Sequence, residues 1–405
     1  NLEMKVIPCL GDIESKGLFF NKEVWEETYQ KALIEYKNKK ESLDNYIIEN
    51  YPKFVNRQLN FFDNKLTCAI SWSSPKQVVA FFSDLGICPE EESKSTKKMS
   101  KTVGSKAMAS LLTREDLSSR ERDLISTYIK FKKSEQATTT FGLDFFKYIN
   151  PVTGRIHTSY DQIKNTGRLS SKSPNIQNIP SNLDYRKAFQ CPIEFKLLNC
   201  DYSGQESILL VNLSLDADLL EFYNSGGGDL HSYVASKIFP ELKDLSLDEI
   251  KSKHKDKRQI AKAANFALAY GGSGFTIAKN LGIPKSQGEE VYKAFFKAFP
   301  GLLDYFGECK KRALTDGFIL IDKYTKRKFY FEEFERMQKL LAFDQEEDEQ
   351  KKGKKLKGKY ERASLNYSIQ GAAGSMTKLA LIYIRAYQIK HNAFDRFQVT
   401  NCIHD

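Results

Sequence analysis

The order of apolar and polar positions predicts a chain built mainly from helices. Residues 18–60 and 114–133 mix apolar side chains with many charges, as helices at a protein surface do. Residues 207–312 are also expected to be helical, with breaks at the stretches NSGGGD, YGGSG and FPG. A further long helix is expected over residues 362–392.

Strands are expected in shorter stretches that lie far apart in the sequence. Residues 66–72, LTCAISW, form a strand-like run, and residues 317–332 predict a hairpin. Residues 150–200 are rich in Gly, Pro, Asn and Ser and lead into the run FKLLNCDYS, and a second run, FQVTNCI, lies at the end of the chain. Helices dominate and the strands come from distant segments, which predicts an α+β fold.

Turn-forming and charged residues predict a helix start and two loops. Ser73 or Ser74 suits the N-cap of a helix that has Pro75 in its first turn. Residues 90–106 are polar and contain Gly and Ser, so they are expected to form a loop. Residues 345–358 are first acidic and then basic, and a solvated loop is expected there too.

Composition narrows the function only slightly. The 405 residues are 41% hydrophobic, enough for a large core divided into subdomains. Lys and Arg number 62 against 52 Asp and Glu, and this net charge of +10 is compatible with a polyanionic partner. The seven cysteines form no CxxC pair, which favours reduced thiols. No apolar run approaches the ~20 residues that span a bilayer, so a soluble protein without a membrane partner is expected.

The stretch KRQIAKAANFALAYGG places two cations and two aromatic residues at every fourth position. Arg258, Lys262, Phe266 and Tyr270 therefore share one stripe of a helix. A core-facing stripe would be apolar throughout, and a solvated stripe would not carry Phe and Tyr in line. The cations suit a polyphosphate and the aromatic rings suit a base or sugar. An amphipathic helix with this spacing by chance is the alternative.

Two aspartates follow apolar runs. Asp201 comes after FKLLNC, and Asp405 comes after FQVTNCI and His404. Opposed carboxylates at strand ends hold the Mg²⁺ ions of in-line phosphoryl transfer, so the two residues are expected to form one metal site. A third stretch, NTGRLSSKSPNIQNIP, is dense in hydrogen-bonding groups around Arg168 and suits contacts with a sugar–phosphate backbone.

Six stretches resemble, in order and approximate spacing, the polymerase domain of the family A DNA polymerases. They are TGRLSSKSPNIQNIP, DYSGQE, GGGDLHSYVASKIF, RQIAKAANFALAYG, ERASLNYSIQGAAGSMTKLA and IHD. The resemblance implies a right-hand fold, with an antiparallel palm sheet and helical fingers and thumb. It also implies an enzyme that adds dNTPs to a primer 3′ end, directed by a template, with release of pyrophosphate.

The resemblance assigns catalytic and metal-binding roles. Two Mg²⁺ ions would be bound by the carboxylates of Asp201 and Asp405 and by the backbone at Tyr202. Arg258 and Lys262 would hold the triphosphate, and Lys262 would also protonate the leaving pyrophosphate. His231 resembles a further phosphate contact.

The remaining implied contacts are with the nucleotide and with DNA. Phe266 resembles the residue beside the nucleotide sugar, and Tyr270 the residue that stacks in the templating-base position. Glu206 resembles the steric gate against ribonucleotides, with Gln205 beside it. The residues implied in primer–template binding are Arg168, Gln177, Asn178, Arg362, Asn366, Gln370 and Lys133. The family commonly has Gln and an apolar residue where Gly204 and Gln205 stand, and such departures suggest a divergent, phage-like branch.

The resemblance also divides the chain. Residues 1–145 are expected to form the palm edge and thumb, and residues 146–212 the first palm part with the first metal carboxylate. Residues 213–345 are expected to form the fingers, and residues 346–405 the helix that joins fingers and palm and the second palm part. Because the sequence stops within the last motif, we expect a truncated sequence or a polymerase completed by another polypeptide or a replisome partner. A cytoplasmic location in a bacterial or phage-infected cell is expected, with an organelle as the alternative.

Two other functions stay open. One is a non-catalytic primer–template-binding fragment, which would bind duplex DNA without incorporation. The other is a single-subunit RNA polymerase, which shares the Arg…Lys pair and the Tyr-Gly, although Glu206 and TGRLSS favour the DNA enzyme.

Overall fold

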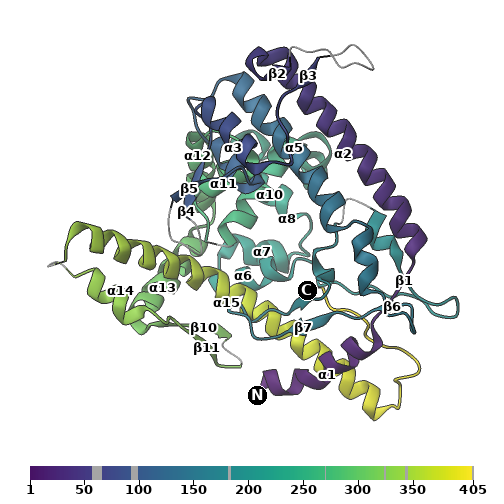
Figure 1. Ribbon diagram of the computed structural model, residues 1–405. Helices are drawn as coiled ribbons and strands as arrows, with labels where there is room; N and C mark the ends of the chain where they lie inside the picture. Colours follow the sequence, from purple (N-terminus) through teal and green to yellow (C-terminus); the bar gives the residue numbers. More distant parts are fainter. Residues whose placement is uncertain are drawn as a thin grey trace.

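The computed structural model (Figure 1) describes most of the chain. The described residues are 1–56, 66–92, 99–180, 184–269, 271–322, 325–342 and 345–403. Tyr270 and Asp405, two of the predicted site residues, lie outside these ranges. No helix within the described ranges is both long enough and apolar enough to cross a membrane.

The N-terminal helical body packs two long helices side by side. Its helices are α2 (Lys22–Asn50), α3 (Pro75–Asp84), α4 (Ser105–Leu111) and α5 (Ser119–Thr140). Two short strand pairs join it, β2 (Val55–Asn56) with β3 (Thr67–Cys68) and β4 (Glu90–Glu92) with β5 (Met99–Lys101). Its core combines aliphatic and aromatic side chains, and Phe81, Phe82, Tyr128 and Phe131 are almost fully buried. The predicted helix start is confirmed, because Ser74 caps α3 and Pro75 is its first residue.

The central helical body follows from residue 205. It contains α6 (Gln205–Ser214), α7 (Ala217–Asn224), α8 (Leu230–Ile238), α9 (Leu247–Lys253), α10 (Lys255–Ala269), α11 (Gly274–Leu281), α12 (Lys285–Ala298) and α13 (Pro300–Asp316). Its core joins α8 and α10 through small side chains, since Ala235, Ala261 and Ala264 are completely buried. This close packing sets the distance between α8 and the side of α10 that carries Arg258, Lys262 and Phe266.

The base carries small antiparallel sheets and the longest helix. Its helices are α1 (Leu2–Lys16), α14 (Phe334–Leu340) and α15 (Glu347–Lys390). One sheet has the order β6 (Arg155–Ile156), β1 (Leu18–Phe20), β9 (Phe189–Gln190), and two hairpins pair β7 (Ser159–Asp161) with β8 (Ser170–Lys172) and β10 (Phe318–Asp322) with β11 (Arg327–Tyr330). The hairpin predicted over residues 317–332 is confirmed. Short 3₁₀ helices span Pro52–Phe54, Leu143–Tyr148, Ile176–Asn178, Asp184–Ala188 and Pro240–Leu242.

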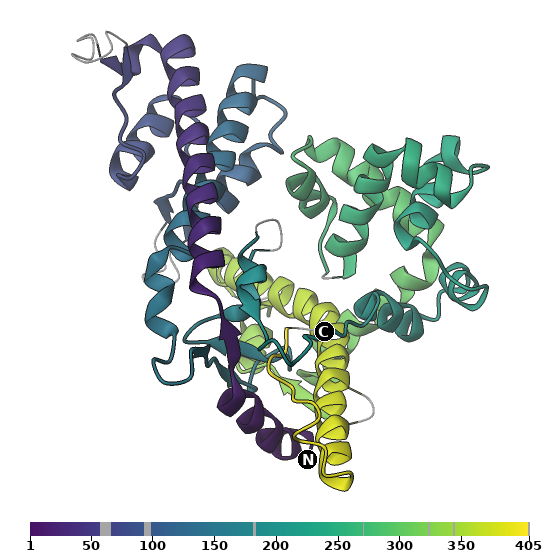
Figure 2. The ribbon, with the colours of Figure 1, turned by 90° about the vertical axis from the view of Figure 1, so that its right-hand side faces the viewer.

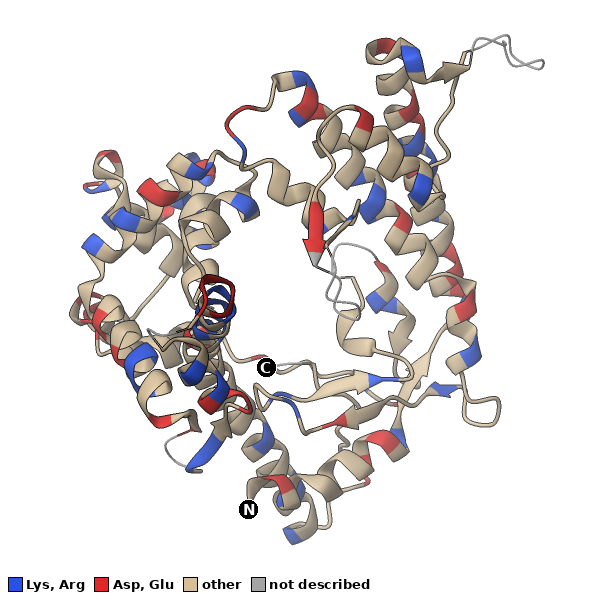
Figure 3. Cartoon of the chain, turned by 60° about the vertical axis from the view of Figure 1, so that its left-hand side comes forward, with Lys and Arg blue, Asp and Glu red and all other residues tan. Residues whose placement is uncertain are grey.

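The two helical bodies stand on opposite sides above the base (Figure 2) and face each other in the view of Figure 3. Among the described residues, the two bodies contact each other where residues 112–115 meet residues 282–286. The Lys285 backbone N–H donates to the Thr113 carbonyl at 3.2 Å, and the Ser286 N–H donates to Glu115 Oε1 at 3.3 Å. The fold is therefore mixed α+β and helix-rich, as the sequence predicted.

A buried ion-pair network ties the parts of the base together. Lys378 on α15 has no exposed side-chain surface, and its Nζ lies 2.8 Å from both carboxylate oxygens of Glu3 on α1. Arg327 on β11 donates to the same carboxylate at 2.5 Å. Gly167 lies against the Arg327 guanidinium, and its φ of +76° is in the left-handed region that favours glycine. The network thus fixes the loop that carries Arg168.

Two predicted strands do not form. Residues 195–200 and 397–403 have no strand partner within the described part of the chain. Leu198 is 83% exposed, so the apolar run FKLL is not packed in a core. A strand is stable only when a neighbour satisfies its backbone groups, and an apolar run alone does not supply one. The prediction for residues 66–72 was also too long, because only Thr67–Cys68 is a strand.

Two predicted loops are regular. Part of 90–106 forms the β4–β5 hairpin, and 345–358 lies mostly within α15. Tertiary packing explains the helix. Leu356 and Tyr360 pack on the cluster around Phe331 and Met337, with the rings of Tyr360 and Phe331 stacked at 3.9 Å between centroids.

Candidate nucleotide and metal site

The polar stripe of α10 meets a histidine from α8. Arg258, Lys262 and Phe266 lie on α10 at the predicted spacing. The Lys262 Nζ lies 6.0 Å from the centroid of the Phe266 ring, and the centroids of the His231 and Phe266 rings are 5.9 Å apart. The structure therefore brings together four residues that the sequence predicted as nucleotide contacts. We call them the α8–α10 cluster.

Asp229 holds Arg258 in place. Arg258 Nε lies 2.6 Å from Asp229 Oδ2, and Nη2 lies 3.0 Å from Oδ1. Asp229 also accepts a hydrogen bond from Ser232 Oγ at 2.6 Å. Burial raises the pKa of Asp229, but the hydrogen bonds from Arg258 and Ser232 and the Arg258 charge outweigh burial and lower this pKa to about 2. Asp229 is therefore an anion at neutral pH.

Asp229 was not predicted as a site residue, although the sequence carries a signal for it. The stretch GGGDLHS places this aspartate two positions before His231. Its partner, however, lies 29 positions away in the sequence, so only the packing of α8 on α10 reveals the pair.

His231 is held as a neutral ring. Burial lowers its pKa, the charges of Arg258 and Lys262 lower it further, and Asp229 opposes them. Its Nδ1 lies 3.3 Å from Asn265 Nδ2. A neutral imidazole beside two cations is poised to gain a proton when negative charge arrives.

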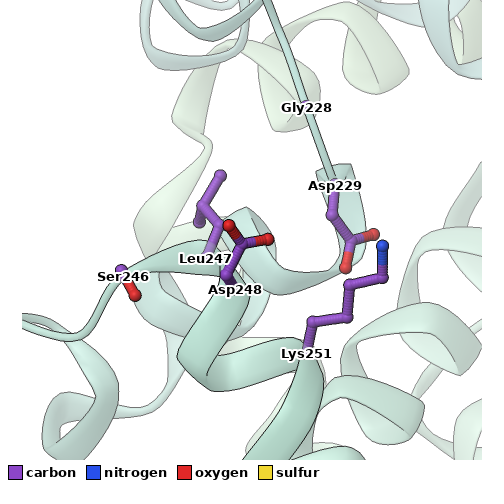
Figure 4. A pocket seen from close by; sticks show the side chains of 6 residues that line it. All are labelled: Gly228, Asp229, Ser246, Leu247, Asp248 and Lys251. Carbon is purple, nitrogen blue, oxygen red and sulfur yellow. The ribbon is translucent and has the colours of Figure 1, made fainter.

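Asp229 also lines a hollow. It has a volume of about 590 Å³ and is lined by Gly228, Asp229, Ser246, Leu247, Asp248 and Lys251. In Figure 4 the Lys251 side chain extends toward the Asp229 carboxylate. Asp229 therefore both lines this hollow and pairs with Arg258.

Glu206 and Arg168 form an ion pair. Glu206 lies in the first turn of α6, directly after Gly204 in the left-handed conformation. The two side chains are 15% and 23% exposed. A predicted steric gate and a predicted DNA contact are thus neighbours, joined across 38 positions of sequence.

Within the part of the chain that the structure describes, four buried side-chain atoms of predicted site residues have no hydrogen-bond partner. They are Arg168 Nε, both amide atoms of Gln205 and Asn366 Oδ1. Gln205 is only 4% exposed. Leaving buried polar groups unpaired costs roughly 1–3 kcal/mol each, so this group of atoms is suited to a polar ligand.

The structure describes only part of the predicted metal site. Asp201 and Tyr202 lie exposed in the irregular segment before α6, while Asp405 falls outside the described residues. Within the described ranges, no three His, Cys, Asp or Glu side chains are grouped as metal ligands. The exposed carboxylate of Asp201 has the oxygen donors that Mg²⁺ prefers.

The predicted DNA contacts differ in accessibility. Arg362, Lys133 and Asn178 are exposed, Asn366 is half-buried and Gln370 is 8% exposed. Gln177 is buried, accepting from the Ser171 N–H at 3.1 Å and donating to the Cys402 carbonyl at 3.0 Å. Its amide braces the hairpin against the last residues of the chain.

The chain resembles known polymerases over most of its length. Residues 45–405 match the model of DNA polymerase family A. The chain is 29% identical over 317 residues to DNA polymerase I of Pseudomonas aeruginosa, covering 77% of this chain and 31% of that protein. It is 25% identical over 393 residues to DNA polymerase I of Treponema pallidum, covering 95% of this chain and 34% of that protein. The chain thus spans about a third of these relatives.

A solved structure shares the fold. It is the POL domain of Pol1 from M. smegmatis in complex with DNA primer-template and dNTP. The TM-score is 0.73 with 25% sequence identity, over 100% of this chain and 62% of that one. The architecture is therefore the right-hand polymerase fold expected from the sequence. The chain belongs to DNA polymerase family A.

Proposed function

We propose that this chain carries out template-directed DNA synthesis, adding dNTPs to a primer 3′ end and releasing pyrophosphate. The observation that carries the proposal is the α8–α10 cluster. It presents two cations and a histidine beside one aromatic ring, and Asp229 orients Arg258. A triphosphate needs several positive groups at fixed positions, and a sugar or base needs an apolar face. The fold and relatives of the chain support the same activity.

The residues of the α8–α10 cluster would each contact the incoming nucleotide. Arg258 and His231 would bind phosphate oxygens, and Lys262 would bind them and give a proton to the leaving pyrophosphate. Phe266 would pack against the sugar, and Tyr270 would stack in the templating position. Glu206 and Gln205 would limit the space at the sugar 2′ position, which would favour dNTPs.

Two Mg²⁺ ions would be held by the carboxylates of Asp201 and Asp405 and by the backbone at Tyr202. When bound, they would activate the primer hydroxyl and neutralise the developing phosphate charge. The accessibility of Asp201 supports this assignment.

Primer–template DNA would contact Arg168, Gln177, Asn178, Arg362, Asn366, Gln370 and Lys133. The similar M. smegmatis structure, which is a complex with DNA primer-template and dNTP, supports these partners. We assign the thumb to the N-terminal helical body, the fingers to the central body and the palm to the base. This assignment differs from the predicted division in two places, because α6 begins the central body and the hairpin β10–β11 and α14 belong to the base. The reported relatives are bacterial, which supports a cytoplasmic site of action. A completing polypeptide stays a prediction.

Primer extension tests the proposal. The purified chain, Mg²⁺, dNTPs and a labelled primer–template should yield templated products, and Asp201→Ala should abolish them. Asp304→Ala, which changes an exposed aspartate on α13, is the matched control and should leave extension intact. Salt-sensitive primer–template binding without extension by the wild type would favour a binding fragment instead. Extension that survives Asp201→Ala would overturn the assigned metal site.

A further inference from the structure

The first turns of α15 carry a dense run of lysines that the proposed polymerase reaction does not use. We call residues 351–359 the lysine arm. Its lysines are Lys351, Lys352, Lys354, Lys355, Lys357 and Lys359, and all six are exposed. In Figure 1 this end of α15 projects away from the rest of the base, with α14 beside it.

Packing on one side fixes the direction of these lysines. Gly353 is buried against Leu340 of α14, where an added Cβ would lie 3.0 Å from the Leu340 backbone. Leu356 and Tyr360 continue the same contact. The three residues lie within about 60° of one another around the helix, at 100° per residue. The lysines therefore occupy the remaining, outward side of an anchored helix.

The arm continues the predicted DNA-binding face. Lys351, Lys355 and Arg362 fall within about 40° of one another around the helix axis. Arg362 is exposed and begins the row that leads to Asn366. From Lys351 to Arg362 the rise is about 16 Å, which matches roughly five base pairs of B-DNA. One stripe of α15 thus carries cations across both segments.

The charge of the arm is only partly balanced. Lys351 pairs with Glu347 and Asp348, and Lys352 pairs with Glu349. Lys354, Lys357 and Lys359 have no carboxylate partner among the residues that the structure describes. Holding several like charges together on one helix is unfavourable, so an external anion would relieve this repulsion.

The chemistry of the arm favours a duplex backbone over single-stranded DNA. Proteins that grip single strands add exposed aromatic rings on which bases stack. Within 351–359 the outward residues are lysines and a glycine, and the adjacent ring of Tyr360 is buried. We propose that the lysine arm binds the phosphate backbone of the duplex that Arg362 and Asn366 contact. This inference rests on the proposed function, which supplies the duplex.

Salt-dependent binding tests the inference. Each lysine–phosphate contact adds about 0.9 to the slope of log K against log salt concentration. The triple variant Lys351→Gln, Lys355→Gln and Lys359→Gln changes the three lysines that lie within about 60° of Arg362 around the helix. It should lower the slope for a blunt DNA duplex by about 2 to 3. It should also weaken binding at ~100 mM salt at least tenfold. Gln keeps a helix-forming side chain, so α15 should persist, and circular dichroism checks this.

A matched triple variant supplies the control. Lys293→Gln, Lys297→Gln and Lys311→Gln removes the same charge from exposed positions on α12 and α13 and should leave the slope unchanged. Equal slopes for the two triple variants would overturn the inference. A larger loss on single-stranded DNA than on duplex would also overturn it. If the wild type bound no DNA, the proposed function itself would fail.

Discussion

Arg258 and Asp229 form a two-point ion pair, with Nε 2.6 Å from Oδ2 and Nη2 3.0 Å from Oδ1. The pair joins α10 to the start of α8 and leaves the remaining guanidinium donors of Arg258 for another acceptor. A carboxylate that holds an arginine by two hydrogen bonds fixes the plane of the guanidinium. Asp229 therefore acts as a positioning residue for the α8–α10 cluster.

Replacing Asp229 with Asn should raise the dNTP KM about tenfold, or ~1.4 kcal/mol, because Arg258 loses its fixed orientation. The kcat should change much less. Steady-state incorporation kinetics check this split. Asp248→Asn, an exposed residue lining the same hollow, is the control and should leave KM unchanged. Equal effects from both substitutions would argue against positioning by Asp229.

The same variant has a predicted dependence on pH. The pKa of Asp229 falls from 3.8 to about 2 on folding, so its stabilising contribution is complete above pH 3.8 and is lost as pH falls toward 2. Urea unfolding should therefore show the wild type more stable than Asp229→Asn at pH 7, and the difference should shrink below pH 3.8. A difference that is constant down to pH 2 would contradict the ion pair.

Substitutions of Glu206 should separate the effect of side-chain bulk from the effect of charge on the discrimination between dNTPs and ribonucleotides. Glu206→Ala opens space beside the sugar and should reduce discrimination against ribonucleotides about 10- to 100-fold. Glu206→Gln keeps the bulk and should preserve most of that discrimination, while it releases Arg168 from its ion pair. Competition between dNTP and rNTP on one template measures both. Equal discrimination by Ala and Gln variants would show that bulk is not the cause.

His231 should make nucleotide binding depend on pH. Its pKa lies below its usual value in the free protein, and a bound triphosphate would raise it. Between these two pKa values binding takes up a proton, so dNTP affinity should increase as pH falls from 8 to 6. Titrations with His231→Gln should show a flatter profile. Parallel profiles for the two proteins would remove His231 from the phosphate contacts.

Lys378→Met should destabilise the fold by about 3 kcal/mol, because a buried charge pair loses one partner. The Glu3 carboxylate would keep only Arg327. The shift in urea midpoint measures this loss, and Lys390→Met at the exposed end of α15 is the control. A loss below ~0.5 kcal/mol would mean that the network does not hold α1 against α15.

Local periodicity predicted what depends on neighbouring turns of one helix. The stripe of Arg258, Lys262 and Phe266 follows from a spacing of four, and the cap at Ser74 follows from local hydrogen bonding. The pairs Arg258–Asp229 and Arg168–Glu206 were not predicted, because each joins residues that only tertiary packing brings together.

Long-range packing also explains the errors in secondary structure. FKLLNCDYS and FQVTNCI have the composition of strands, yet a strand depends on a partner that the run itself does not specify. The charged segment after residue 346 became helical because Leu356 and Tyr360 gave it a surface to pack on. The charged composition of this segment reflects the exposed side of the helix and does not reveal the side that packs on the cluster around Phe331 and Met337.

The most direct test of the α8–α10 cluster is single-turnover incorporation of one correct dNTP by Lys262→Ala beside Lys255→Ala. Both lysines lie on α10. Lys255 is exposed and lies two turns before Lys262. We expect the incorporation rate to fall at least 100-fold in Lys262→Ala, which is typical of losing a general acid, and to change less than twofold in Lys255→Ala. Equal rates for the two folded variants would contradict the assignment of the cluster as the triphosphate site.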